Sequence, residues 1–117
     1  MIAELITRVF ATRNLAHLAH WKTKSYSQHM ALGSLYDDII DGIDGIVEAY
    51  QGIFGLVDVP QLPAVKSADI VKHLQEECVW LAKNRSAIAQ NVAALENLID
   101  GLTDTYMTTL YKLKNLS

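Results

Sequence analysis

The stretch that decides the fold is Ser25–Phe54, which reads SYSQHMALGSLYDDIIDGIDGIVEAYQGIF. Its apolar residues recur at intervals of three and four, the period of an amphipathic helix. Ser25 followed three residues later by Gln28 is a capping-box pattern and predicts where this helix begins. The stretch therefore predicts one helix of about 28 residues, roughly 42 Å long at 1.5 Å per residue.

The residues on either side of this stretch predict three more helices. The same spacing predicts a helix over Ile2–Lys22, and Gly55–Val65 holds both prolines and is expected to be a connector. Ser67 is the expected N-cap of the next helix, with Asp69 in its first turn. Apolar stripes over 70–88 and 92–113 predict the last two helices, with a break between Ser86 and Asn91.

These elements predict an all-α fold, a four-helix bundle of ferritin-like topology. In that topology the helices before and after the connector are parallel, and Gly55–Lys66 crosses the length of the bundle. Twelve residues span at most about 42 Å, so such a crossover is feasible but taut. A plain up-down-up-down bundle with a folded-back loop is the alternative.

Length and composition predict one domain over residues 1–117. The single cysteine, Cys78, excludes an internal disulfide, and no apolar run is long enough to be a signal peptide or a membrane span. A cytoplasmic protein without membrane partners is expected. With 10 basic and 13 acidic residues the net charge is −3, which makes nucleic acid an unlikely partner.

The 26–54 helix carries a row of carboxylates. Asp37, Asp41, Asp44 and Glu48 fall within about 60° of one another on a helical wheel, and Ser25–Val65 contains no Lys or Arg. Like charges at this spacing destabilise a helix by about 0.2–0.5 kcal/mol per pair. The row is either a solvated acidic face or an anchor for cations.

The same helix contains Gly33, Gly42 and Gly45, each about 1 kcal/mol less favourable than alanine inside a helix. Close packing within the bundle is one explanation. The interpretation we favour from the sequence is a partner helix from a second subunit that meets the acidic row.

Three of the four histidines lie around the turn before this helix: His17, His20 and His29. Imidazoles beside unpaired carboxylates are ligands suited to iron, manganese or zinc. His73 lies apart and is expected at the surface or at a helix cap. No glutamate is followed three residues later by histidine, which argues against a di-iron site within one chain. Any such site is expected between chains.

The strings LAHLAHWKTKSYSQH and YDDIIDGIDGIVEAYQG resemble the mini-ferritins of the Dps family, the DNA-binding proteins from starved cells. The family signature is His-x-x-His-Trp, then a histidine that opens the second helix, then Asp-x-x-x-Glu fifteen residues later. His17, His20 and Trp21 match the first element, and His29 matches the second. Asp44 and Glu48 lie fifteen and nineteen residues beyond His29.

The resemblance implies a ferroxidase site shared by two antiparallel second helices. His20 and His29 of one subunit would then face Asp44 and Glu48 of the other, with His17 a neighbour rather than a ligand. The family usually has a carboxylate where this chain has Gly33. Asp37 or Asp41 is the candidate replacement, unless that ligand is missing.

The expected function is therefore that of a Dps-like ferroxidase and iron-storage protein, an oxidoreductase acting on metal ions. It would assemble as a homodimer and, by the resemblance, as a twelve-subunit shell. A non-enzymatic assembly or interaction protein on a mini-ferritin scaffold is the alternative. DNA compaction is disfavoured because the chain has no lysine-rich arm at Met1–Glu4.

Overall fold

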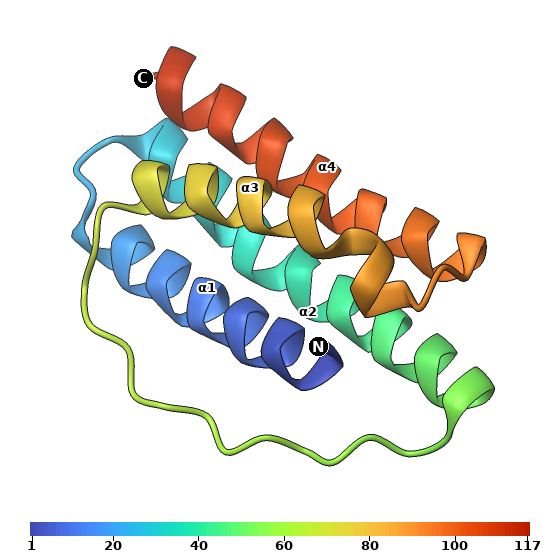
Figure 1. Cartoon of the computed structure of the whole chain (residues 1–117). Coiled ribbons are helices and arrows are strands. Elements are labelled where there is room, and N and C mark those ends of the chain that lie inside the picture. Colours follow the sequence, from blue (N-terminus) through green and yellow to red (C-terminus); the bar gives the residue numbers. More distant parts are fainter.

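A computed structural model describes the whole chain, residues 1–117, as four α-helices with no β-strand (Figure 1). The helices are α1 (Ile2–Lys22), α2 (Tyr26–Phe54), α3 (Ile70–Ala89) and α4 (Ala93–Asn115). The prediction of an all-α chain with four helices is confirmed. None of these helices has the length and apolar character needed to cross a lipid bilayer.

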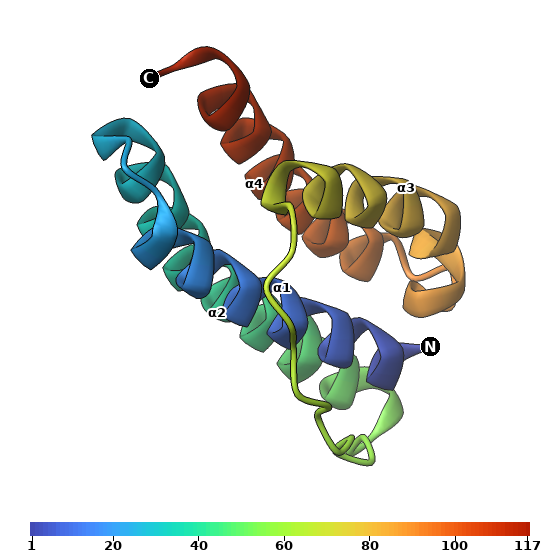
Figure 2. The same ribbon diagram turned by 90° about the vertical axis from the view of Figure 1, so that its left-hand side faces the viewer.

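The helices pack as two antiparallel pairs, α1 with α2 and α3 with α4 (Figure 1). The connector Gly55–Asp69 returns along the length of the bundle, so α3 begins beside the end of α1 (Figure 2). There, Lys22 Nζ donates a hydrogen bond to Ser67 Oγ at 3.1 Å. Past the other end of α3, Gln90 Nε2 donates to the Tyr50 hydroxyl of α2 at 2.8 Å. Helices α2 and α3 therefore run in the same direction.

The core is built from the apolar stripes of all four helices. On α2 the fully buried residues recur every three or four positions, which turns one face of the helix inward. The acidic row lies on the opposite face and is exposed. The largest fully buried side chains are Leu5, Val9, Leu32, Leu35, Ile39, Ile43, Ile46, Leu74, Ile88, Leu95, Ile99 and Tyr106.

The start of α2 agrees with the sequence, whereas the start of α3 does not. The Ser25 hydroxyl accepts a hydrogen bond from the Gln28 amide at 3.3 Å, as a capping residue should. The prediction that Ser67 caps α3 is wrong. Asp69 is the N-cap, and its carboxylate accepts from the amides of Val71 and Lys72 at 3.1 and 3.2 Å. Ser67 is instead held by Lys22, two residues before the helix.

Replacing Asp69 with alanine should lower the free energy of unfolding by about 1 kcal/mol, because two amides at the start of α3 lose their acceptor. Urea denaturation measures the change. Ser67→Ala is the matched control and should change stability by less than about 0.5 kcal/mol, since its only partner is an exposed lysine. A larger loss for Ser67→Ala than for Asp69→Ala would contradict this assignment.

The break between α3 and α4 falls within the predicted interval. Gln90 and Asn91 adopt left-handed backbone angles, with φ of 49° and 61°, and turn the chain back on itself. Arg85 ties the two helices together by donating to Asp100 at 2.6 Å and to Glu96 at 3.0 Å. These contacts are partly exposed, so they set the geometry of the hairpin more than its stability.

One ion pair is buried. Arg8 Nη1 of α1 lies 2.6 Å from Glu77 Oε2 of α3, and the side chain of Glu77 is only 7% exposed. The Arg8 guanidinium also lies over the Trp80 ring, 4.3 Å from its centroid. Arg8 Nε is buried without a hydrogen-bond partner. The pair joins α1 to α3, two helices that are not consecutive in the chain.

Candidate metal centre

His20, near the end of α1, and His29, in the first turn of α2, lie against each other. Their rings stack at a centroid distance of 3.6 Å with an angle of 19° between planes. His20 Nδ1 donates to the carbonyl of His29 at 2.6 Å, and His29 Nδ1 donates to the carbonyl of His20 at 2.9 Å. The α1–α2 turn therefore holds the two imidazoles in one fixed arrangement.

These two hydrogen bonds decide which nitrogen of each ring is free. A carbonyl oxygen only accepts, so each Nδ1 carries the hydrogen and each neutral ring has its lone pair on Nε2. No hydrogen bond engages either Nε2. An Nδ1–H bound to a backbone carbonyl is the outer-shell contact that orients histidine ligands in metal sites. In each ring Nδ1 is therefore engaged and Nε2 is free of hydrogen bonds.

A shallow hollow of about 230 Å³ opens beside the pair. Seven residues line it: His20, His29, Met30, Gly33, Ser34, Tyr36 and Asp37. Asp37 is thus the member of the acidic row that lies nearest the imidazoles, and it is exposed and free of any ion pair. Two nitrogen donors and one carboxylate share this hollow.

Gly33 lies close against the histidine pair. A Cβ built at this position would lie 3.2 Å from His20 Cε1, tighter than ordinary contact. The interpretation of the glycines as a surface for a partner helix is therefore wrong for Gly33, where the neighbour is in the same chain. It is also wrong for Gly42, whose Cβ would face Leu102 of α4 at 3.7 Å. Gly45 is exposed and has nothing within 4 Å, so an external neighbour stays a prediction there.

Alanine at Gly45 should raise the free energy of unfolding by about 0.5–1 kcal/mol, because it removes a flexible residue from an open helix position. Gly33→Ala should gain less, because the new methyl group pushes on the His20 ring. Chemical denaturation of the two variants compares them directly. Equal gains at both positions would show that the ring yields freely and that the pair is loosely held.

The other three predicted carboxylates lie farther along α2. Asp44 is fifteen residues beyond His29, which is about 22 Å along a helix axis. Asp41, Asp44 and Glu48 are exposed and form no ion pair. Within one chain no group of three or more His, Cys, Asp or Glu residues comes together to hold a metal ion. His20, His29 and Asp37 line one hollow without forming such a group, and the rest of the row lies outside that hollow.

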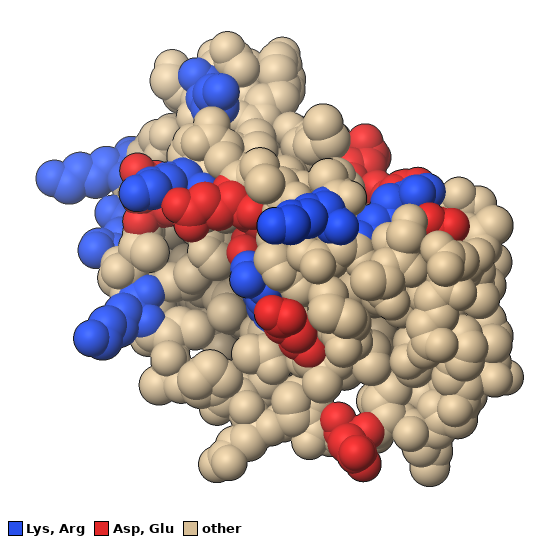
Figure 3. Space-filling view, viewed as in Figure 1, with Lys and Arg blue, Asp and Glu red and all other residues tan.

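The outer face of α2 differs in charge from the face seen in Figure 3. Over the face seen in Figure 3, lysine and arginine side chains are interspersed with aspartate and glutamate. Between Ser25 and Val65, by contrast, there is no basic residue, and no base from elsewhere in the fold pairs with the acidic row. Tertiary structure leaves this row without a counter-charge.

His17 lies beside the histidine pair but does not line the hollow. Its ring stacks on Tyr36 at 4.2 Å and lies 4.4 Å from the ring of Trp21, which is 68% exposed. Loss of solvation lowers the pKa of His17, and the nearby positive charge of Arg13 adds to the effect. A ring held between two aromatic side chains in this way is a neighbour of the histidine pair, as the resemblance implied.

His73 was expected at the surface or at a helix cap, and the structure instead places it partly inside the bundle, in the first turn of α3. It is half-buried on α3, and its Nε2 lies 2.8 Å from Thr12 Oγ1. Thr12 gives its own hydrogen to the Arg8 carbonyl, so it accepts from His73. Burial lowers the pKa of His73, although Glu77 opposes the shift. Thr12 and Glu77 are therefore interior polar residues that the sequence reasoning missed.

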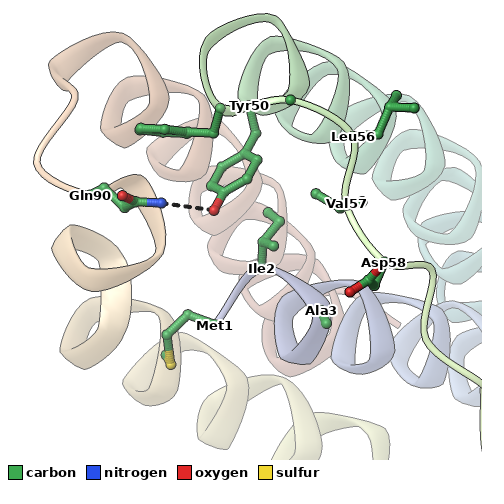
Figure 4. Close-up of a pocket in the computed structure, with 10 residues that line it drawn as sticks. Met1, Ile2, Ala3, Tyr50, Leu56, Val57, Asp58 and Gln90 are labelled. Carbon is green, nitrogen blue, oxygen red and sulfur yellow. Dashed lines mark hydrogen bonds between the residues drawn. The ribbon is translucent and has the colours of Figure 1, made fainter.

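A larger hollow, of about 450 Å³, lies at the other end of the bundle (Figure 4). It forms where the start of α1, the end of α2 and the beginning of the connector meet, and Tyr50 and Gln90 close one side with their hydrogen bond. Its lining is mostly apolar, and Asp58 is its only ionisable side chain apart from the Tyr50 phenol. It offers no set of metal ligands.

Fold and site together define a four-helix bundle protein with two stacked histidines and an acidic row that forms no ion pair. Residues 20–113 match the sequence profile of DUF5856, a family of unknown function, and the chain belongs to this family. It is also similar to an uncharacterized 14.6 kDa protein in the mobD-ri intergenic region of Enterobacteria phage T4. The two are 27% identical over 112 residues, which cover 94% of this chain and 85% of the relative. No solved structure matches the chain.

Proposed function

We propose that the protein binds Fe(II) and promotes its oxidation and storage, as a divergent mini-ferritin of the Dps type. The site would be shared between two copies of the chain. His20 and His29 of one copy would bind the ion together with Asp44 and Glu48 of the other. Manganese or zinc suits the same donors.

The observation that carries this proposal is the pair of imidazoles, His20 and His29, each held by a hydrogen bond to the backbone of the other. Each ring has its Nδ1 hydrogen committed to a carbonyl and its Nε2 lone pair free. Both histidines line the same hollow, together with Asp37.

Two further features support it. Helices α2 and α3 run in the same direction and are joined by one long connector, which is compatible with a ferritin-like bundle. The acidic row has no internal counter-charge, so cations are its natural partners. In the reaction, two Fe(II) ions each give one electron to hydrogen peroxide, which takes up two protons and leaves as two waters. Fe(II) is here the substrate, and the carboxylates would hold it.

Asp37 takes the place of the carboxylate that the Dps family usually has at the position of Gly33. A side chain at Gly33 would crowd the His20 ring, whereas Asp37 lies one turn farther along the same hollow. Asp41 lies another turn away, outside the hollow, and is the weaker candidate.

The crowding at Gly33 also favours a second function, that of a non-enzymatic assembly protein. With one family ligand absent and its position crowded by His20, the bundle would keep the interface without the oxidation activity. Stopped-flow oxidation of Fe(II), under oxygen and under peroxide, separates the two functions. A rate above that of buffer supports the ferroxidase, and a rate equal to buffer with both oxidants leaves only the assembly protein.

Asp44→Asn should abolish metal binding and should also make the metal-free protein more stable. Asp44 has carboxylates at i−3 and i+4, and removing each like-charge pair should add about 0.2–0.5 kcal/mol. Isothermal titration with zinc and denaturation in chelator measure the two effects. Asp38→Asn is the control for binding, because Asp38 faces the groove between α2 and α4. If Asp44→Asn instead destabilised the protein by more than about 1 kcal/mol, the row would be structural.

A further inference from the structure

Charge is separated along the long axis of the bundle. The end of α1, the starts of α2 and α3 and the end of α4 lie at one end (Figure 1). Residues 16–32, 64–75 and 108–117 form this end, and they hold six of the ten basic residues but only one of the thirteen acidic residues, Asp69. We call it the lysine end, after its basic residues Lys22, Lys24, Lys66, Lys72, Lys112 and Lys114. The net charge of −3 therefore conceals one strongly basic end.

Helix dipoles account for only part of this arrangement. A lysine in the last turn of a helix offsets the partial negative charge there, and Lys22, Lys112 and Lys114 occupy such positions. Lys72 lies in the first turn of α3, where the dipole disfavours a cation. At the opposite end of the bundle, the last turns of α2 and α3 contain no basic residue. The lysines therefore follow one end of the bundle and not the direction of each helix.

The charge of the lysine end is not neutralised within the chain. Five of its lysines are exposed, Lys112 is partly buried, and none of the six lies in an ion pair. The Asp69 carboxylate is engaged with two backbone amides as the cap of α3. The next carboxylate along α3, Glu76, shares a hollow with Lys72 but forms no ion pair with it. In Figure 3, basic side chains project from the left edge of the molecule, where α1 ends and α3 begins in Figure 1.

Large apolar side chains are exposed among these lysines. Trp21, at the end of α1, is 68% exposed, and Tyr26, at the start of α2, is 77% exposed. Met30 and Leu116 are 52% and 43% exposed. Tryptophan and tyrosine are enriched at the headgroup level of membranes, and lysine keeps its charge in water while its stem covers apolar surface. The lysine end thus combines positive charge with side chains suited to a membrane interface.

Two features favour a lipid surface over nucleic acid as the anionic partner. All six basic residues are lysine, whereas arginine is the residue preferred where the phosphates of nucleic acids are recognised through paired hydrogen bonds. The aliphatic side chains Met30 and Leu116 add apolar area that a lipid interface can cover, but they cannot stack on bases as aromatic rings do.

We propose that the lysine end docks on the surface of a membrane that contains anionic phospholipids. Clusters of roughly four to eight basic residues are typical of protein segments that bind such lipids. Trp21 and Tyr26 would lie at the level of the headgroups, and the acidic row of α2 would point away from the membrane. Docking of this kind needs no membrane-spanning helix. It does not depend on the proposed metal site.

Co-sedimentation with lipid vesicles tests the inference, in chelator so that metal binding plays no part. Vesicles of one part phosphatidylglycerol and two parts phosphatidylcholine should bind the chain, and vesicles of phosphatidylcholine alone should not. Each lysine near an anionic surface contributes about fivefold in affinity, so Lys24→Gln/Lys66→Gln/Lys72→Gln should bind roughly a hundredfold more weakly. Salt at about 1 M should weaken binding by the wild type, because it screens the attraction beyond ~3 Å.

Lys83→Gln is the matched control for Lys24→Gln, since both lysines are exposed and lie in no ion pair. Lys83 is eleven residues beyond Lys72, about 16 Å farther along α3, so its loss should leave vesicle affinity unchanged. Lys24→Gln should weaken binding about fivefold. With phosphatidylglycerol vesicles, the tryptophan emission of the wild type should shift to shorter wavelength, and that of Trp21→Phe should not.

Three results would overturn the inference. The first is no binding to phosphatidylglycerol vesicles, or equal binding to neutral ones. The second is an equal loss of affinity for Lys24→Gln and Lys83→Gln, which would mean that the lysine end is not the contact. The third is tighter binding to a single-stranded or duplex DNA oligonucleotide than to the vesicles at about 0.15 M salt, which would make nucleic acid the partner. Fe(II) oxidation is decided by its own assay in every case.

Discussion

Replacing Arg8 with methionine is expected to lower the free energy of unfolding by about 3–5 kcal/mol, because it leaves the Glu77 carboxylate buried without its cation. Methionine keeps most of the apolar stem that packs on Trp80, so the change isolates the loss of charge. Of the two side chains Glu77 is the more buried, at 7% exposed against 34% for Arg8. The charge left behind is therefore the one that water cannot reach.

The double variant Arg8→Met/Glu77→Leu is the matched control. Replacing a buried ion pair with apolar side chains of similar volume is often neutral or stabilising, so most of the lost stability should return. Urea denaturation of the wild type and both variants gives the comparison. A loss below about 1 kcal/mol in the single variant would mean that Glu77 finds another donor or reaches water.

The second large effect concerns the metal centre. In the variant His20→Ala/His29→Ala, Fe(II) oxidation should fall to the rate in buffer. Zinc affinity should fall by more than the roughly 10–100-fold that the loss of one outer-shell contact produces. The physical reason is that the variant removes both nitrogen donors of the proposed site and leaves only its carboxylates.

His17→Ala is the control for this variant, since it removes a ring from the same aromatic cluster but no proposed ligand. Its zinc affinity should stay close to that of the wild type. Denaturation in chelator checks that both variants remain folded. If the double variant bound zinc as tightly as the wild type, the histidine pair would be a packing feature, and the metal proposal would fail.

The helices themselves were predictable because the forces that define them are local. The three- and four-residue spacing of apolar side chains located α1 and α2 at Ile2–Lys22 and Tyr26–Phe54. The start of α3 was not predictable, because Ser67 and Asp69 are both good capping residues within three positions. In the structure Asp69 takes the cap, and Ser67 instead accepts a hydrogen bond from Lys22 of another helix.

The buried pair Arg8–Glu77 left a trace in the sequence. Glu77 lies three residues after Leu74 and four before Leu81, both buried. This helical spacing predicts that its carboxylate faces the interior. The sequence gives no comparable signal for its partner, Arg8. Arg8 is 69 residues away, and nothing in the pattern of α1 says which helix it will face.

By itself the sequence determined the four helices, the acidic row on α2 and the absence of lysine and arginine between Ser25 and Val65. Helical periodicity and composition are properties of a single segment. Only the tertiary structure decided that His20 stacks on His29, that Gly33 makes room for that stack, and that Asp37 shares its hollow. Each of these depends on how the α1–α2 turn sets one helix against the next. That geometry is fixed by packing between helices. The spacing of residues within one helix does not predict it.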